Sequence, residues 1–501
     1  MPLQALPVSD ATAGGALLVL AIVMPAVALV ALLGLGGRGA RAIVAAALLV
    51  QLLVGARVAL LVAATQAPLV YVVGGFQPPL GITLRADGIS ALMMVVSAVI
   101  VAAAAGFAWK DFGQPRKRPE TRLSLIFWSA LLAMTSALNL LFTSTDLFNL
   151  YVGLELLTFA AIPVVAIKGG AETVRAALRY LLFAVFGSML YLLGIVLIYG
   201  AYGTLATSEI AAQITLNAAT LAAAGFVTVG LLAKTALFPF HLWLPPAHAG
   251  APAAGSAVLS ALVVKGSLFL LMRLWFDTFP TLRTPDDMQL LALLGALAVI
   301  VGSVTALRQK RLKLLVAYST VAQIGYMFFV FTLVPQDAGD VIAGTAWTGA
   351  WLQVVAHAFA KAGMFLAAGL VAEAMGHDRI RDLGGLSAKA PLVVLAFAFS
   401  GLSLMGLPPS GGFSAKFMLL VAALAEGHWL WAIVIIAGGV LAGAYVFGVL
   451  SRMMAAPAAG VEMATVGRGR QLIALGLALV ALLMGFLPLS PLSFLEIGRF
   501  P

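Results

Sequence analysis

The chain lacks cysteine altogether and is poor in histidine and in charge. Its 501 residues contain no cysteine and five histidines, and only 10% of them are charged. Without thiols the chain forms no disulfide and supplies no cysteine ligand to zinc or to an iron–sulfur cluster. The histidines stand singly, so we predict no metal site and no bound cofactor. A redox enzyme would therefore need its catalytic centre on another chain.

Hydrophobic residues make up 62% of the chain. Apolar runs of about 20 residues, the length that spans a bilayer as a helix, recur along nearly the whole sequence. We therefore predict an all-α polytopic membrane protein with about fourteen transmembrane helices. They are placed at 14–36, 41–64, 88–109, 122–142, 147–168, 174–201, 218–240, 253–275, 288–307, 313–334, 346–374, 391–425, 429–451 and 471–490. The segment 65–86 alternates in polarity and contains Gly-Gly and Pro-Pro, so it predicts a short extramembrane β-hairpin.

The basic residues are distributed unevenly between the loops. Twenty of the 29 lysines and arginines fall in the odd-numbered connections and four in the even-numbered connections and the C-terminal tail. The positive-inside rule then places the odd loops in the cytoplasm and both termini on the outer, periplasmic side of a bacterial inner membrane. The net charge of +10 is explained by this topology, so we predict the lipid bilayer, and no nucleic acid, as a partner.

Five further basic residues lie inside predicted spans: Arg57, Lys234, Lys265, Lys361 and Lys416. Glu155 is the one acidic residue deep within a span. A charge at this depth costs about 2.5–3.5 kcal/mol on insertion scales, and such residues usually serve ion or proton movement. A carboxylate that moves towards or away from a buried amine controls whether the amine holds its proton. The set therefore favours a proton relay over its alternative, structural ion pairs, because several amines have no acid to match them.

Two of the spans are interrupted by proline and glycine beside a lysine. Pro239 follows Lys234 in LLAKTALFPFHLWLPP, and Pro408 and Pro409 precede Lys416 in GLPPSGGFSAK. Proline ends a regular helix, and the freed backbone is tolerated at membrane depth only inside protein or along a wet cavity. Because the breaks lie five spans apart, we predict discontinuous helices 7 and 12 within two inverted five-helix repeats. The predicted domains are 1–121 with the hairpin, 122–275, 276–451 and 452–501.

Histidines near these breaks extend the hypothesis. His357 and Lys361 are spaced i, i+4 on one helical face, and a neutral imidazole passes protons between amines. The alternative for His357 is a hydrogen-bonded structural role. His241 and His248 flank the first break and are either part of a proton exit or ordinary loop residues. Arg57 either snorkels to the interface or contacts a neighbouring subunit.

Several stretches resemble the antiporter-like membrane subunits shared by respiratory complex I and Mrp-type Na⁺/H⁺ antiporters. The resemblance covers roughly residues 70–450 and includes DLFNLYVGLELL, LLAKTALFPFHLWLPPAHAGAPAAGSAVLSALVVKGSLFLL, LKLLVAYSTVAQIGYM, HAFAKAGMFLAAG and GLPPSGGFSAKF. It implies that Glu155 and Lys234 are the switching pair, Lys265 the central relay and Lys416 the terminal proton site. The lysine at 416 resembles the D-type subunit of Mrp antiporters and the N-type subunit of complex I. Gln323 departs from the pattern, because many relatives have histidine there.

The resemblance implies a proton-translocating subunit of a multisubunit Mrp-type cation/proton antiporter. Its proton relay would comprise Glu155, Lys234, Lys265, His357, Lys361 and Lys416. The alternative is an antiporter-like subunit of a complex I-like NADH:quinone oxidoreductase or a membrane-bound hydrogenase, with the redox step on partner subunits. Other membrane subunits are thus expected partners, with protons, and Na⁺ through the complex, as the transported ions. A stand-alone carrier for a small solute and a structural anchor are less favoured.

Overall fold

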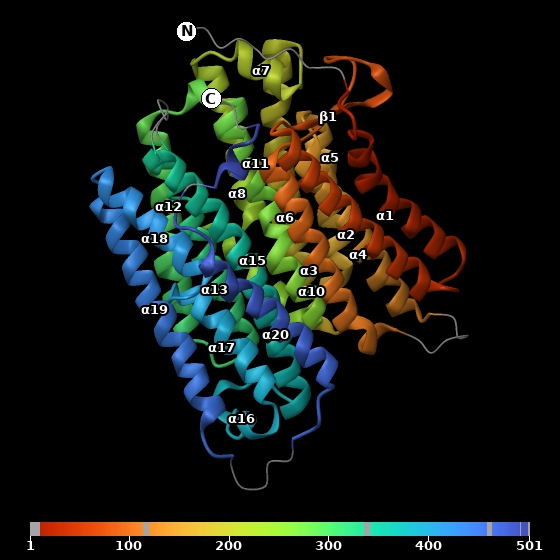
Figure 1. Ribbon diagram of the computed structural model, residues 1–501, viewed down its shortest axis with the longest axis vertical. Coiled ribbons are helices and arrows are strands. Elements are labelled where there is room, and N and C mark those ends of the chain that lie inside the picture. The colour runs from red at the N-terminus through yellow and green to blue at the C-terminus, as the bar shows by residue number, and fades with distance from the viewer. Residues whose placement is uncertain (1–10, 114–119, 335–340, 458–462, 491, 499–501) are drawn as a thin grey trace.

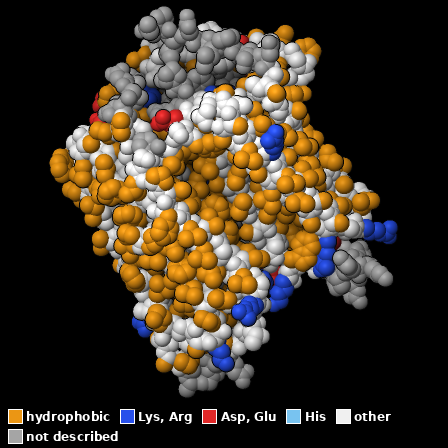
Figure 2. All heavy atoms as spheres, viewed as in Figure 1, with side chains coloured by type: hydrophobic (Ala, Val, Ile, Leu, Met, Phe, Trp, Pro, Cys, Tyr) orange, Lys and Arg blue, Asp and Glu red, His pale blue; other side chains and the backbone are white. Residues whose placement is uncertain are grey.

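The computed structural model describes residues 11–113, 120–334, 341–457, 463–490 and 492–498. Within these ranges, thirteen helices are long and apolar enough to cross a membrane. They run side by side along the long axis of the molecule, and the β-hairpin lies at one end of the bundle (Figure 1). On the face in Figure 2, a wide hydrophobic band crosses the middle, and most of the visible lysine and arginine side chains lie below it. The molecule is therefore a multi-pass helical membrane protein, as predicted.

The predicted hairpin is confirmed between the second and third helices. Strands β1 (Leu69–Val72) and β2 (Thr83–Ala86) pair antiparallel, with Leu69 opposite Ala86. The hairpin follows α1 (Ala16–Gly34) and α2 (Ala40–Thr65) and leads into α3 (Gly88–Phe112). Asp87 begins α3 by accepting a hydrogen bond from the amide of Ser90, so the strand passes directly into a capped helix.

The first broken helix follows three regular spans. These are α4 (Arg122–Thr143), α5 (Leu147–Ala166) and α6 (Ala171–Tyr202), with a short α7 (Thr207–Gln213) after them. Helix α8 (Ala218–Thr235) then stops inside its span, and the chain continues through a 3₁₀ turn, Phe240–Trp243, into α9 (Leu244–Gly250). The break lies where the sequence predicted it, one residue beyond Lys234.

The next spans form the interior of the bundle. Helices α10 (Ala253–Val258) and α11 (Val264–Arg273) are joined by a π-helical turn, and a second π turn follows at Leu274–Thr278. Helices α12 (Pro285–Leu307), α13 (Leu312–Met327), α14 (Val330–Leu333) and α15 (Val341–Met375) follow. The α10–α11 span, α13 and α15 are the most buried spans. Since α15 packs against α3, α10, α13, α17, α18 and α20, it is the central helix.

The predicted span at 391–425 differs in form from the others. It consists of two 15-residue helices, α17 (Pro391–Met405) and α18 (Gly411–Ala425), which explains why thirteen rather than fourteen single helices are long enough to span. Gly406 ends α17 in the left-handed conformation and Ser410 caps α18. A short α16 (Leu386–Lys389) precedes them, and α19 (Trp429–Met454) and α20 (Arg468–Leu483) complete the bundle. The division into two inverted repeats stays a prediction.

Candidate functional site

Glu155 and Lys234 form an ion pair between α5 and α8. The Lys234 ammonium nitrogen lies 2.9 Å from a carboxylate oxygen of Glu155 and 3.1 Å from the Thr158 hydroxyl. The hydroxyl of Ser188 on α6 donates to the same carboxylate oxygen. Lys234 is buried, whereas the Glu155 side chain is 18% exposed. The pair predicted from the sequence is therefore assembled, with its acid towards the outside of the bundle.

The break in α8 places Lys234 in the last turn of that helix. Ala236 adopts a left-handed conformation with φ 58°, and the amide of Leu237 reaches back to the carbonyl of Leu232, which closes the helix. The indole of Trp243 donates to the carbonyl of Ala233 at 3.0 Å, so a carbonyl freed by the break is satisfied inside the protein. The Trp243 ring also stacks on Tyr180 at 4.3 Å, which holds the second half of the span against α6.

A small cavity lies beside Lys234 towards α11. It measures about 10 Å³ and is lined by Lys234, Thr158, Tyr180, Trp243 and Ser267, among others. A cavity of this size holds about one water molecule when polar groups face it. Thr235 donates to Ser267 on α11 at 3.0 Å, so hydroxyl groups continue from the end of α8 to the helix that carries Lys265.

Lys265 lies at the centre of the bundle and is fully buried. It follows the π-helical turn Leu259–Val263, and its ammonium group donates back to the carbonyl of Ser260 in that turn. The Ser260 hydroxyl lies 2.9 Å from that of Thr320 on α13. Among the described residues no carboxylate pairs with Lys265. A π turn inside a membrane helix frequently marks a functional position, and here it adjoins the central lysine.

Lys361 and His357 continue the polar line along α15. The Lys361 ammonium donates to the carbonyl of Val316, at 2.9 Å, and to the hydroxyl of Ser319, both on α13. His357, one turn earlier, is buried, and neither of its ring nitrogens has a hydrogen-bond partner among the described residues. Buried polar atoms left in this state are usually met by ordered water. The relay role of His357 and its alternative, a hydrogen-bonded structural role, both stay predictions.

Lys416 lies just after the second break. Its ammonium donates to the carbonyl of Leu404 in the last turn of α17 and lies 4.1 Å from the centroid of the Tyr326 ring. Gln323 donates to the same carbonyl at 3.0 Å and accepts from Gln353 on α15, also at 3.0 Å. Gln353 is one turn before His357. Gln323, which stands where many relatives have histidine, therefore connects the second break to the central helix.

Two buried groups lie outside the relay residues predicted from the sequence. His248 lies on α9, is fully buried and stacks on Phe365 of α15 at 4.5 Å, so it is no loop residue. Lys313, counted among the loop cations, is buried in the first turn of α13 and donates to the carbonyl of Ala251 at 2.8 Å. A basic residue in the first turn of a helix, such as Lys313, looks like a loop residue in the sequence, so its burial could not be predicted. Arg57 is exposed on α2 and His241 is buried in the turn after the first break.

Comparisons with known proteins agree with this architecture. The family described as NADH:quinone oxidoreductase/Mrp antiporter, TM, matches residues 144–442. The chain is 34% identical to the N-type subunit of NADH-quinone oxidoreductase from Desulforudis audaxviator, over 76% of this chain and 74% of that one. It is 29% identical to the D-type subunit of the Na⁺/H⁺ antiporter from Alkalihalophilus pseudofirmus, over 74% and 72%.

Solved structures share the fold. A chain of the Mrp complex from a Dietzia species superposes with a TM-score of 0.86 at 24% identity, covering 97% of both chains. A chain of respiratory complex I from Thermus thermophilus gives a TM-score of 0.74 at 26% identity, covering 93% of this chain and 97% of that one. The protein therefore belongs to the family of antiporter-like membrane subunits shared by NADH:quinone oxidoreductases and Mrp antiporters.

Proposed function

We propose that the chain moves protons through its interior as one subunit of a multisubunit Mrp-type cation/proton antiporter. The observation that carries this proposal is the line of buried amines and polar side chains from Glu155 to Lys416. A stand-alone solute carrier would need a substrate-shaped site of polar groups beside the breaks. Here the breaks hold lysines whose ammonium groups are already bonded to Glu155, Thr158 or the carbonyl of Leu404.

The proton would move by switching of the Glu155–Lys234 pair. With the carboxylate at 2.9 Å, Lys234 keeps its proton, because the two charges compensate the cost of burial. When Glu155 moves away, the buried ammonium loses its counter-ion and passes a proton towards Lys265 through the water-sized cavity and the Thr235 and Ser267 hydroxyls. The amine left behind is neutral and ready to accept the next proton.

The second half of the relay would run along α15 and α13. Lys265 contacts the π turn before α11, and the Ser260 hydroxyl of that turn contacts Thr320 of α13. Lys361 contacts α13 directly, and His357 lies one turn from Lys361. From there Gln353, Gln323 and the Leu404 carbonyl lead to Lys416. Amide groups and carbonyls cannot themselves carry a proton onward as an amine does. They therefore support the line by holding water between the titratable groups.

Both ends of the proposed relay reach the surface of the bundle, which supports a multisubunit host. Glu155 on α5 is partly exposed, and Phe148, Val152 and Phe159 on the same helix are exposed apolar residues. Lys416 lines an open apolar cavity of about 640 Å³ between α18 and α19. In Figure 1, α5 and α19 lie on opposite sides of the molecule. A neighbouring membrane subunit on each side would cover the two ends and extend the line.

The proposed setting is a bacterial inner membrane with the basic loops in the cytoplasm and both termini outside. An Mrp-type antiporter and a complex I-like oxidoreductase or hydrogenase both fit the chain as hosts. The relatives include a subunit of a Na⁺/H⁺ antiporter and a subunit of an NADH-quinone oxidoreductase, and this chain matches both at similar coverage. The Mrp host therefore remains the first proposal and the redox host its alternative. In either host, partner subunits would carry any Na⁺ or electron-transfer step.

The test is Lys234→Ala in the intact complex, with Lys310→Ala as the matched control. Lys310 is exposed and its side chain lies in the loop before α13, so its loss should leave transport unchanged. Lys234→Ala should abolish proton translocation in vesicles, or Na⁺ resistance in cells, while the partner subunits still co-purify. Transport at the parental rate in an assembled Lys234→Ala complex would refute the relay. The set of co-purifying partners distinguishes the antiporter from the redox host.

A further inference from the structure

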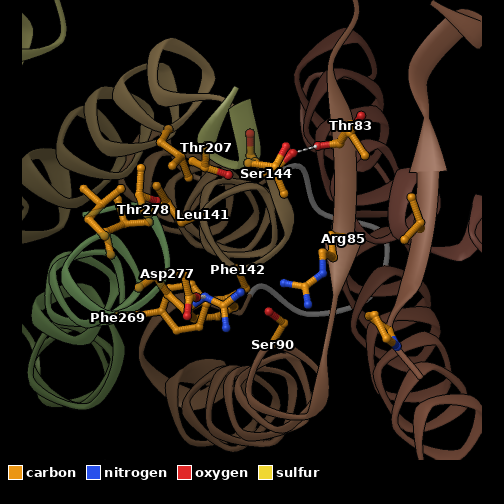
Figure 3. Close-up of a pocket in the computed structure, with 18 of the residues that line it drawn as sticks. Thr83, Arg85, Ser90, Leu141, Phe142, Ser144, Thr207, Phe269, Asp277 and Thr278 are labelled. Carbon is orange, nitrogen blue, oxygen red and sulfur yellow. Dashed lines mark hydrogen bonds and ion pairs between the residues drawn. The ribbon is translucent and has the colours of Figure 1, made fainter. Parts of the chain in front are cut away.

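A cavity with hydroxyl and charged side chains in its wall lies at the end of the bundle opposite most of the basic loops, beneath the β-hairpin. It measures about 170 Å³ and is bounded by β2, by the ends of α3, α4 and α5, by the start of α7 and by the α11 span. Hydroxyl groups of several elements line it: Thr83, Ser90, Ser144, Thr145, Thr207, Ser208 and Thr278. Figure 3 shows Arg85 extending from its strand into the cavity, with Asp277 across from it.

Three charged residues that line this cavity form one neutral cluster with Asp87. Arg273 contacts Asp277 at 2.8 Å and also pairs with Asp87, which in turn lies 3.5 Å from Arg85. Burial by itself would raise the pKa of Asp87, but Arg273 and Arg85 outweigh it and hold that pKa below its usual value. Asp87 thus stays a carboxylate between two arginines, and Asp277 is the cluster's carboxylate on the α11 span.

The cavity is built to hold water. Its volume admits several water molecules, and polar side chains line it on β2, on α3, in the turn between α4 and α5, on α7 and on the α11 span. The hydroxyl of Thr83, a residue only 6% exposed, has no hydrogen-bond partner among the described residues. A buried hydroxyl without a protein partner, facing a polar cavity, is normally bonded to water.

The cavity is lined by the part of the α11 span that follows Lys265. Helix α11 carries Lys265 at one end and Arg273 at the other, about 12 Å apart at 1.5 Å per residue. Phe269, about one turn from each, stands between them. Its ring packs edge-on against Phe142, at 5.1 Å, and against Trp351 of the central helix, at 5.8 Å. Phe269 and Phe142 also line the cavity, and the three rings together are called the aromatic seal.

We propose that this cavity is a proton vestibule through which Lys265 exchanges protons with the outer aqueous phase past the aromatic seal. The proposal rests on the proton-relay function. When the seal rings part, the Lys265 ammonium gives up a proton and becomes a neutral amine. Water carries that proton to the Asp277 carboxylate, which becomes a carboxylic acid and then releases the proton to water outside. The reverse sequence loads Lys265 from the same side.

The first test uses the absence of cysteine, which makes single-cysteine variants free of background. Ser90→Cys places a thiol in the cavity wall, and Ser97→Cys places one two turns deeper on the same helix, also buried but outside the cavity. In the assembled complex, a membrane-impermeant methanethiosulfonate reagent added from the proposed outer side should label Ser90→Cys and leave Ser97→Cys unlabelled. Failure to label Ser90→Cys, or equal labelling of both, would overturn the vestibule.

The second test opens the seal. Phe269→Ala should raise passive proton leak in unenergised vesicles, Phe269→Leu should not, and Lys265→Ala in the Phe269→Ala background should remove the leak. A leak that persists without Lys265 would show a different route. Asp277→Asn should slow proton translocation, and Asp277→Glu should restore it, with partner co-purification as the check on assembly. If Lys234→Ala is inactive but Asp277→Asn pumps at the parental rate, the relay stands and the vestibule is refuted.

Discussion

The Glu155–Lys234 pair allows a double-mutant cycle whose size follows from its geometry. At 2.9 Å and an effective dielectric constant of about 20, the two charges attract by about 6 kcal/mol. Desolvation of both ions offsets most of this, so the intact pair adds little net stability. Removing one partner alone, however, leaves a buried charge uncompensated and typically costs about 3–5 kcal/mol.

We therefore expect Glu155→Gln and Lys234→Met each to destabilise the folded protein. The double variant should lose less unfolding free energy than the two single variants lose together. The expected coupling energy is about 1–3 kcal/mol, measured by denaturant unfolding in mixed micelles. Ser188→Ala is the reference, because it removes a hydrogen bond to Glu155 and leaves both charges in place. Its expected cost is about 1.5–3 kcal/mol, since the acceptor is charged.

Transport gives the second readout of the same cycle. Both single variants should stop proton translocation, and so should the double variant, because a stable but uncharged site has no proton to pass. Additivity of the two stability changes within about 0.5 kcal/mol would show that the residues do not interact in the membrane. Translocation by the double variant at the parental rate would refute the pair's role as a switch even if the coupling energy were found.

Three further predictions concern the scaffold around the relay. Gly230→Ala should destabilise the protein by about 1–3 kcal/mol in thermal unfolding, because the new Cβ would lie 2.4 Å from the Gly187 carbonyl oxygen where α6 crosses α8. Gly225→Ala on the same helix meets nothing within 4 Å and should be neutral or stabilising. Gln323→Leu should slow proton transfer while leaving assembly intact, and Gln323→His should retain it, measured in vesicles. The stabilisation from Asp87, whose folded-state pKa is lowered, should be fully present above its unfolded value of about 4. It should be lost as pH falls through the lower folded-state pKa, so the acid limb of the thermal stability–pH curve should flatten in Asp87→Asn.

The spans, the hairpin and the breaks were readable in the sequence because local chemistry decides them. A bilayer requires about 20 apolar residues per helix, so hydropathy alone located the spans within a few residues at most ends. Pro239 and the Pro408–Pro409 pair cannot continue a helix, so both breaks were expected where they occur. The one numerical difference, two short helices at Pro391–Met405 and Gly411–Ala425 in place of a single long span, follows from the second of those breaks.

The candidate site was only partly readable. Glu155 and Lys234 were expected to meet, and they do. The burial of Lys313 and His248 was missed, because each stands near a helix end that looks like a loop in the sequence. The position of Gln323 between the Leu404 carbonyl and Gln353 could not be derived either, since those groups lie on three different helices.

The sequence by itself determined the class of the protein, a multi-pass helical bundle. It also determined which ionisable residues lie inside the spans, including lysines at depths where a membrane helix normally carries none. Those properties depend on the free energy of transferring each residue into the bilayer, which each residue contributes separately. The tertiary structure alone decided which amine reaches which hydroxyl or carbonyl, and where a cavity remains between Arg85 and Phe269. Such contacts depend on the way in which helices distant in the chain pack against one another. The hydropathy of each helix does not specify that packing.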